Sequence, residues 1–215
     1  SRNTYIELIM TDYKAIKGKT VQHVASDLDN SAGEGQIWFN TTSSDYKTII
    51  KAAGSWSTSG ALNTGRSTEG AGTQTAGLVA GGAPPVTGKT EEYDGSSWTE
   101  SGDLGTSRYY TMSVGSQTAA LCTGGYTGTA SSGTTETYNG STWTETGDLG
   151  TARYGSGGGG TTTAGLVAGG GTPNLAVSEE FDGSAWAEGN DMNNGREYMG
   201  WANQGTQTAA LVHGG

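Results

Sequence analysis

Four sequence markers recur along this chain at a common spacing, and this repeat constrains the fold more than any other feature. Successive tryptophans stand 42, 45 and 43 residues apart, and an arginine follows each of them by ten residues. A diglycine and a segment resembling Thr-Gln-Thr-Ala keep the same order in every unit. A period of about 20 to 50 residues indicates an array of equivalent supersecondary units. The repeated positions are Trp56, Trp98, Trp143 and Trp186; Arg66, Arg108, Arg153 and Arg196; and Gly81-Gly82, Gly124-Gly125, Gly169-Gly170 and Gly214-Gly215.

Each unit is predicted to form four short β-strands. The first follows the arginine, as in SRYYTMSVG, and the second is an apolar run such as QTAALCTGG, which is typical of a strand covered on both faces. The third and fourth, such as TTETYN and STWTET, are separated by Asp94-Gly95, Asn139-Gly140 or Asp182-Gly183. These dipeptides favour tight hairpins. The diglycine ends the second strand, where we expect packing too close for a Cβ atom.

Four strands in a unit of this length are typical of a β-propeller blade. We therefore predict an all-β fold, a small propeller of about four four-stranded blades preceded by an extended N-terminal docking segment. The units would lie near residues 54–94, 95–139, 140–182 and 183–215. Two alternatives stay open: a β-solenoid, and an open propeller that another subunit completes.

The order diglycine, aromatic residue and tryptophan in each unit resembles the kelch repeat, over residues 54–215. The resemblance implies a kelch-like propeller in which the glycines pack near the axis and the aromatic residues pack between blades. The aromatic positions are Tyr93, Tyr138 and Phe181, together with the tryptophans.

The N-terminal residues differ in composition from the repeats. Residues 1–35 are predicted to form a docking segment and linker, and residues 36–215 the propeller. The last unit stops after its second strand, so residues 36–59 are expected to supply strands that close the last blade. The candidate docking residues form a short apolar and aromatic group: Tyr5, Ile6, Leu8, Ile9 and Tyr13.

A second resemblance concerns the segment before the first repeat. Ser26-Asp27, Asn30, the run from Gly35 to Asn40, and Tyr46-Lys47 together resemble the opening of virion proteins from marine tailed bacteriophages. Leu28 stands where such proteins often carry proline, and Phe39 where they often carry tyrosine. The resemblance implies a tail-fibre or surface-appendage role, with the N-terminal segment docking to the particle.

Composition excludes several classes of function. The formal net charge of −10 argues against nucleic acid and against anionic membranes as partners. The only cysteine is Cys122, in an apolar run, so packing rather than disulfides is expected to stabilise the fold. No run of 18 apolar residues is present, and the first residues carry no signal-peptide pattern.

The charged residues of the repeat could be catalytic, but their repetition favours structure. The carboxylates that recur with the arginines predict ion pairs between blades or at strand ends; they are Glu91, Glu92, Glu136, Glu179 and Glu180. A sialidase-like site is disfavoured because Asp94 and Trp98 lie four residues apart, whereas the sialidase box needs five. A copper or zinc site lacks clustered ligands, since His23 and His213 are the only histidines. No catalytic residue, metal or cofactor is therefore predicted.

Ligand recognition is expected in the loops, because they vary between units while the strands agree. The candidate face joins the second and third strands and includes Pro84, Pro85, Tyr126, Pro173 and Asn174. A second candidate is the aromatic set after the arginines, which we expect to be at least half core: Tyr109, Tyr110, Tyr154, Tyr198 and Trp201.

The resemblance to phage virion proteins implies a structural virion protein made in the host cytoplasm, and the repetition of the charged residues argues against an enzyme. Its expected partners are other virion proteins through the N-terminal segment, further copies of itself, and a host surface glycan or receptor. The alternatives are a sialidase-like carbohydrate-acting propeller and a stand-alone lectin-like propeller.

Overall fold

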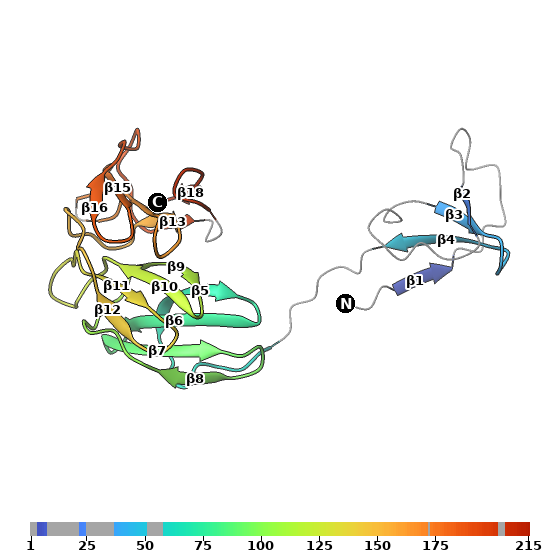
Figure 1. Cartoon of the computed structure of the whole chain (residues 1–215), viewed down its shortest axis with the longest axis horizontal. Coiled ribbons are helices and arrows are strands. Elements are labelled where there is room, and N and C mark those ends of the chain that lie inside the picture. Colours follow the sequence, from blue (N-terminus) through green and yellow to red (C-terminus); the bar gives the residue numbers. More distant parts are fainter. Residues whose placement is uncertain (1–3, 8–21, 25–36, 51–57, 172, 202–204) are drawn as a thin grey trace. The chain divides into compact units, whose positions relative to one another are not determined.

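The computed structural model describes residues 4–7, 22–24, 37–50, 58–171, 173–201 and 205–215. The chain divides into two compact units, residues 1–58 and 59–215 (Figure 1). Every regular element in the described residues is a β-strand, which confirms the predicted all-β class. Within those residues, no helix meets the length and apolarity that a membrane span requires.

The N-terminal unit contains one four-stranded sheet with the order β1-β4-β3-β2. Strand β3 pairs antiparallel with β4 and parallel with β2. Trp38 is fully buried, and the Asn40 side chain accepts hydrogen bonds from the Thr42 and Ser43 amides at 2.8 and 3.1 Å. Asn40 therefore shapes the turn between β3 and β4. The strands are β1 (Thr4–Glu7), β2 (Gln22–Val24), β3 (Ile37–Asn40) and β4 (Asp45–Ile50).

Residues 36–59 are expected to supply strands to the last blade, and this sheet contradicts that expectation for residues 37–50. Strands β3 and β4 pair with each other, and β1 and β2 occupy their remaining edges, so the hairpin has no free edge for another blade. The unit boundary accordingly lies after Thr58 rather than after residue 35. Of the predicted docking residues, Tyr5 and Ile6 lie in β1, while Leu8, Ile9 and Tyr13 lie outside the described residues.

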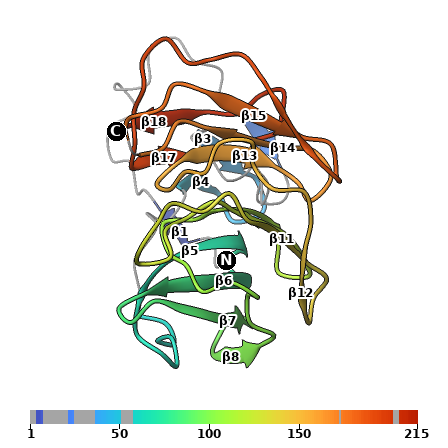
Figure 2. The same ribbon diagram turned by 90° about the vertical axis from the view of Figure 1, so that its left-hand side faces the viewer.

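The second unit contains three four-stranded antiparallel sheets that follow one another along the chain (Figures 1 and 2). The first blade has β5 (Ser67–Thr73), β6 (Ala76–Ala83), β7 (Thr87–Tyr93) and β8 (Trp98–Ser101). The second has β9 (Met112–Ser116), β10 (Ala119–Thr123), β11 (Thr135–Tyr138) and β12 (Trp143–Glu145). The third has β13 (Gly157–Gly160), β14 (Gly165–Ala168), β15 (Ser178–Phe181) and β16 (Trp186–Glu188).

A fourth blade is represented by two strands, β17 (Met199–Trp201) and β18 (Val212–Gly214). The first strands of neighbouring blades touch in sequence, β5 with β9, β9 with β13, and β13 with β17. The described residues of this unit thus form a small β-propeller-like array of three four-stranded blades and a two-stranded fourth. Each blade starts at the strand after the arginine, so the predicted unit boundaries fall within blades. A repeat period defines the spacing of units but not the residue at which a unit starts.

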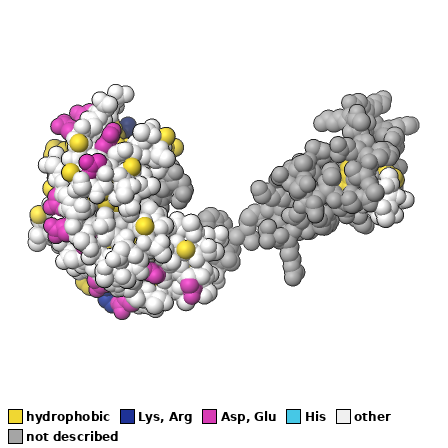
Figure 3. Space-filling model, in the orientation of Figure 1, with side chains coloured by type: hydrophobic (Ala, Val, Ile, Leu, Met, Phe, Trp, Pro, Cys, Tyr) yellow, Lys and Arg dark blue, Asp and Glu magenta, His cyan; other side chains and the backbone are white. Residues whose placement is uncertain are grey.

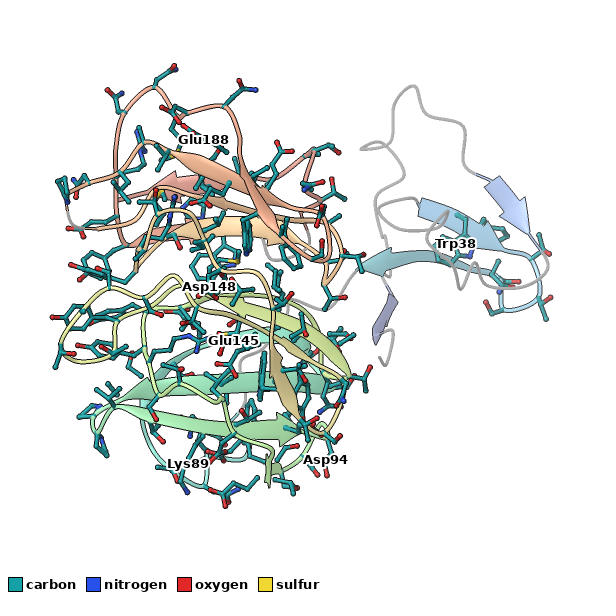
Figure 4. The ribbon with its side chains drawn as sticks, turned by 60° about the vertical axis from the view of Figure 1, so that its left-hand side comes forward. Trp38, Lys89, Asp94, Glu145, Asp148 and Glu188 are labelled. Carbon is teal, nitrogen blue, oxygen red and sulfur yellow. The ribbon has the colours of Figure 1, made fainter. Side chains whose placement is uncertain are left out.

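The turn between the third and fourth strands is built alike in each full blade. The Asp94 side chain accepts hydrogen bonds from the Ser96 and Ser97 amides, both at 2.8 Å, and Gly95 has a φ of +95°. These bonds, with others from the serine hydroxyls, hold the pKa of Asp94 well below its usual value. Figure 4 shows Asp94 at the edge of the first blade. Asn139 and Asp182 accept the equivalent amide bonds in the next two blades.

The diglycines lie where the backbone of the following blade approaches. A Cβ atom on Gly81 would lie 2.3 Å from the Arg108 carbonyl oxygen, and the Gly82 amide donates to that oxygen at 2.9 Å. Gly125 and Gly170 donate in the same way to the carbonyls of Arg153 and Arg196. The diglycine therefore links successive blades through main-chain hydrogen bonds that a side chain would obstruct.

Each outer-strand tryptophan of the second and third blades fills a slot against the preceding blade. Trp143 packs against buried residues of the first two blades, and its indole nitrogen donates to the Thr90 hydroxyl at 2.9 Å. Trp186 repeats this bond with Thr135, also at 2.9 Å, and packs against the main apolar core. That core consists of Met112, Val114, Leu121, Leu149, Val167 and Phe181.

The equivalent slot between the third and fourth blades is an open pocket of about 440 Å³. Its walls include Leu166, Ala168, Ser178, Met192, Ala210 and Val212. By repeat position these correspond to Leu78, Ala80, Thr90, Leu104, Ala120 and Cys122, which surround Trp143. No tryptophan of the described residues fills this slot, and Trp56 lies outside those residues. Completion of the fourth blade by residues 54–59 stays a prediction.

Replacing one alanine in the wall of each slot with leucine distinguishes the open slot between the third and fourth blades from the slot that Trp143 fills. Ala80 belongs to the cluster against which Trp143 packs, so Ala80→Leu should lower the free energy of unfolding by about 1–3 kcal/mol through overpacking. Ala168→Leu should cost about 1 kcal/mol or less, because the pocket beside it has room. Urea unfolding of both variants measures the difference. Equal losses would instead mean that the slot is occupied.

Candidate functional site

Three buried ion pairs account for the repeated charges. Arg66 pairs with Glu91, Arg108 with Glu136 at 2.5 Å, and Arg153 with Glu179 at 2.5 Å. In all three pairs, both side chains are at most 6% exposed. Each pair lies within one blade, where it joins the chain ahead of the first strand to the third strand. The expected ion pairs are therefore present, within blades rather than between them.

The carboxylates of these pairs also hold the connecting loops. The second oxygen of Glu91 accepts from the Asn63 amide at 2.7 Å, and Glu136 and Glu179 accept from the Gly105 and Gly150 amides at the same distance. Burial raises the pKa of Glu91, but hydrogen bonds from Arg66 and from the Asn63 and Thr64 amides outweigh it, so the pKa is lowered. Each of these carboxylates therefore accepts hydrogen bonds from both its arginine and a loop amide.

The fourth repeated arginine has a different partner. Arg196 donates to the Gly214 carbonyl at 3.0 Å. In the full blades the carboxylate comes from the third strand, and the fourth blade has no third strand among the described residues.

Tyr110, just before β9, and Tyr198, just before β17, have an unusual backbone conformation. Tyr110 and Tyr198 have φ values of 55° and 51°, and Gly155 has 60° at the equivalent position. The Gly155 amide donates to the Tyr110 carbonyl at 2.9 Å, and the Tyr198 amide donates to the Gly155 carbonyl at 2.7 Å. These bonds connect the same position in three successive blades. A left-handed conformation costs a tyrosine about 1–3 kcal/mol that a glycine avoids.

The tyrosines form one aromatic cluster. The rings of Tyr110 and Tyr198 have centroids 5.2 Å apart and lie nearly perpendicular, at 81°. Tyr154 lies 5.9 Å from Tyr198 and 5.3 Å from Tyr126. Tyr109 joins through Tyr110 at 4.6 Å. Tyr198 is 54% exposed and Tyr110 37%, so these two rings face solvent while the other three are half-buried.

These two rings border a pocket of about 440 Å³ that residues from all four blades line. We call it the axial pocket. Such a volume lies within the range of small-molecule sites. Its lining residues are Glu69, Gly70, Tyr110, Thr111, Gly155, Ser156, Tyr198, Met199, Gly200 and Trp201.

The axial pocket carries polar groups with unused hydrogen-bonding capacity. The Ser156 hydroxyl is fully buried and has no partner in the described part of the chain. Burial raises the pKa of the Glu69 carboxyl, and no described cation lies within ion-pair distance of it. Thr111 adds a buried hydroxyl. The pocket thus combines aromatic walls with a carboxylate and hydroxyls.

The structure separates the predicted loop residues. Tyr126 joins the aromatic cluster through Tyr109 and Tyr154. Pro84, Pro85, Pro173 and Asn174 are exposed on their loops and do not line the axial pocket. The aromatic set after the arginines does reach the pocket, through Tyr110, Tyr198 and Trp201.

Sequence reasoning missed the polar residues of the pocket. Glu69, Thr111 and Ser156 each stand three residues after one of the repeated arginines. This common spacing is the sequence signal that groups them. Gln117 was also missed: its amide donates to the Gly77 and Tyr93 carbonyls of the preceding blade, and Gln207 repeats this with Gly165 and Phe181.

On the face of the second unit that Figure 3 shows, the acidic side chains of the described residues are scattered rather than gathered in one patch. Among the described residues, no three His, Cys, Asp or Glu side chains gather as a metal site. Cys122 is buried and lies 3.7 Å from an Arg108 nitrogen.

The repeated antiparallel blades, whose first strands together line one aromatic-walled pocket, have the architecture of a small β-propeller. No family model and no curated protein matches the chain. Among solved structures, one titled "Structure of YjhT" is similar over 53% of this chain, with a TM-score of 0.47 and 12% identity. The similar region spans 42% of YjhT, less than half of that chain.

Proposed function

We propose that this chain is a non-catalytic structural module of a bacteriophage particle, a tail-fibre or surface appendage that assembles with other virion proteins and attaches to the host surface. One observation carries the non-catalytic part. Three of the repeated arginines form buried ion pairs with Glu91, Glu136 and Glu179. These are charged groups that a hydrolase site would have used, and here they bind one another. The exposed side chains at the axial pocket, Tyr110 and Tyr198, are aromatic.

The particle role is supported by the N-terminal sequence. The Trp38 to Asn40 part of the phage-like motif forms a strand whose tryptophan is buried and whose asparagine shapes the following turn (Figure 4). These positions are constrained by the fold of the N-terminal unit, which would present its remaining surface to a neighbour in the particle.

The proposal predicts that the chain is a component of purified particles in several copies each. Gradient-purified particles would be analysed by mass spectrometry for its peptides, and by cryo-electron microscopy with an antibody against the propeller. Absence of the chain from particles that remain infectious would overturn the proposal. Release of sugar from sialylated or neutral glycosides by the purified full chain would contradict its non-catalytic part.

A further inference from the structure

We infer that the axial pocket binds one neutral sugar residue of a host surface polysaccharide, with Tyr110 and Tyr198 as stacking walls and Glu69 and Ser156 as hydrogen-bond partners. This inference rests on the proposed attachment role and names the ligand class of its site.

The backbone of the two tyrosines is the first argument. Gly155 adopts the same left-handed conformation at the equivalent position without a steric penalty, whereas Tyr110 and Tyr198 adopt it at a cost. Burial of the rings does not offset this conformational cost, because Tyr110 and Tyr198 are each more than one third exposed. A strained, exposed aromatic residue where glycine would suffice indicates that the ring itself is used.

The shape of the aromatic surface is the second argument. The rings of Tyr110 and Tyr198 stand nearly perpendicular with centroids 5.2 Å apart, so they form two walls of a corner. The electron-rich face of an aromatic ring attracts partially positive C–H groups, which a pyranose ring presents on its faces. Trp201 lines the same pocket and adds a third aromatic side chain.

The polar groups supply the third argument. The Ser156 hydroxyl has no partner in the described residues, and a buried hydroxyl without a hydrogen bond is destabilising. A ligand hydroxyl would satisfy it. The Glu69 carboxylate can accept two hydrogen bonds from adjacent sugar hydroxyls. Hydroxyl-bearing ligands fit this set, and wholly apolar ones do not.

Charge selects a neutral sugar. Glu69 faces the pocket without a described cation beside it, and the chain carries a net charge of −10. A sialic acid or sulfated sugar would bring a second negative charge close to this carboxylate, which Coulomb repulsion opposes.

Binding of the full-length chain to oligosaccharides tests the inference. The neutral probes are unsubstituted and N-acetylated oligosaccharides, and the charged probes are sialylated ones. The assays are a glycan array followed by titration calorimetry with the best neutral probe. We expect a neutral probe to bind, and Tyr198→Gly to weaken it at least about tenfold while the melting temperature stays close to wild type, because glycine accepts this backbone conformation. Glu69→Gln should also weaken binding. Glu145→Gln, an exposed carboxylate change on β12, is the matched control and should have no effect.

Several results would overturn the inference: no binding of any neutral probe, preference for sialylated probes, or unchanged binding in Tyr198→Gly. These outcomes are separable from failure of the proposed function. A chain that is found in particles but binds no neutral sugar defeats only the present inference. A chain that binds the sugar but is absent from particles defeats only the particle role.

Discussion

Replacing Arg108 with methionine is expected to lower the free energy of unfolding by about 3–5 kcal/mol. Arg108 is fully buried, and its guanidinium pairs with Glu136, whose side chain is 3% exposed. Methionine fills a similar volume but leaves the Glu136 carboxylate buried without its counter-ion. Urea unfolding followed by tryptophan fluorescence measures the loss.

An exposed pair provides the matched control. Lys89 and Glu100 also form an ion pair, but their side chains are 38% and 54% exposed, and Figure 4 shows Lys89 on the outer side of the first blade. Lys89→Met should lower the free energy of unfolding far less than Arg108→Met, because solvent screens the exposed pair. Adding Glu136→Leu to Arg108→Met should recover part of the loss, because it removes the unpaired charge. A loss below about 1 kcal/mol for Arg108→Met would contradict a structural role for the pair.

Truncating Trp143 to alanine is expected to lower the free energy of unfolding by about 3–5 kcal/mol. The indole fills the slot between the first and second blades, where it packs against Leu78, Tyr138 and Leu104 and donates to Thr90. Alanine would leave a cavity and an unpartnered hydroxyl. Equilibrium denaturation measures the effect, followed by far-ultraviolet circular dichroism because the substitution removes a fluorophore.

Two variants separate packing from hydrogen bonding at this slot. Trp143→Phe keeps an aromatic ring but loses the donor to Thr90, so it should cost less than the alanine variant. Thr144→Ala changes the neighbouring exposed residue and should cost about 0.5 kcal/mol or less. A Trp143→Ala variant as stable as Thr144→Ala would show that the slot does not hold the blades together.

The roles of the repeat residues could be predicted because repetition and residue type are both visible in sequence. An arginine and a glutamate that recur together are more simply explained as three copies of one ion pair than as a unique catalytic site, and the structure shows three such pairs. The apolar second strand and the Asp-Gly or Asn-Gly turn were likewise readable, because each depends on neighbouring residues.

The axial pocket could not be predicted in the same way. Its residues come from four separate blades, and their approach depends on how the first strands pack around one another. The positive φ of Tyr110 and Tyr198 depends on hydrogen bonds to neighbouring blades. Tyrosine has no intrinsic preference for positive φ, so the residue type does not indicate this conformation. Glu69 and Ser156 gain their significance only from burial beside these rings.

The amino-acid sequence by itself determined the β-strand content, the period of the blades and the residues that hold each blade, since these follow from local alternation, turn chemistry and repetition. Only the tertiary structure decided the partners of strands β3 and β4, the blade phase and the composition of the axial pocket. Strand pairing between distant segments depends on which edges are free and which faces can be buried together. Because β1 and β2 take both edges of the β3–β4 hairpin, that hairpin belongs to the N-terminal sheet, although its sequence is equally suited to a propeller blade.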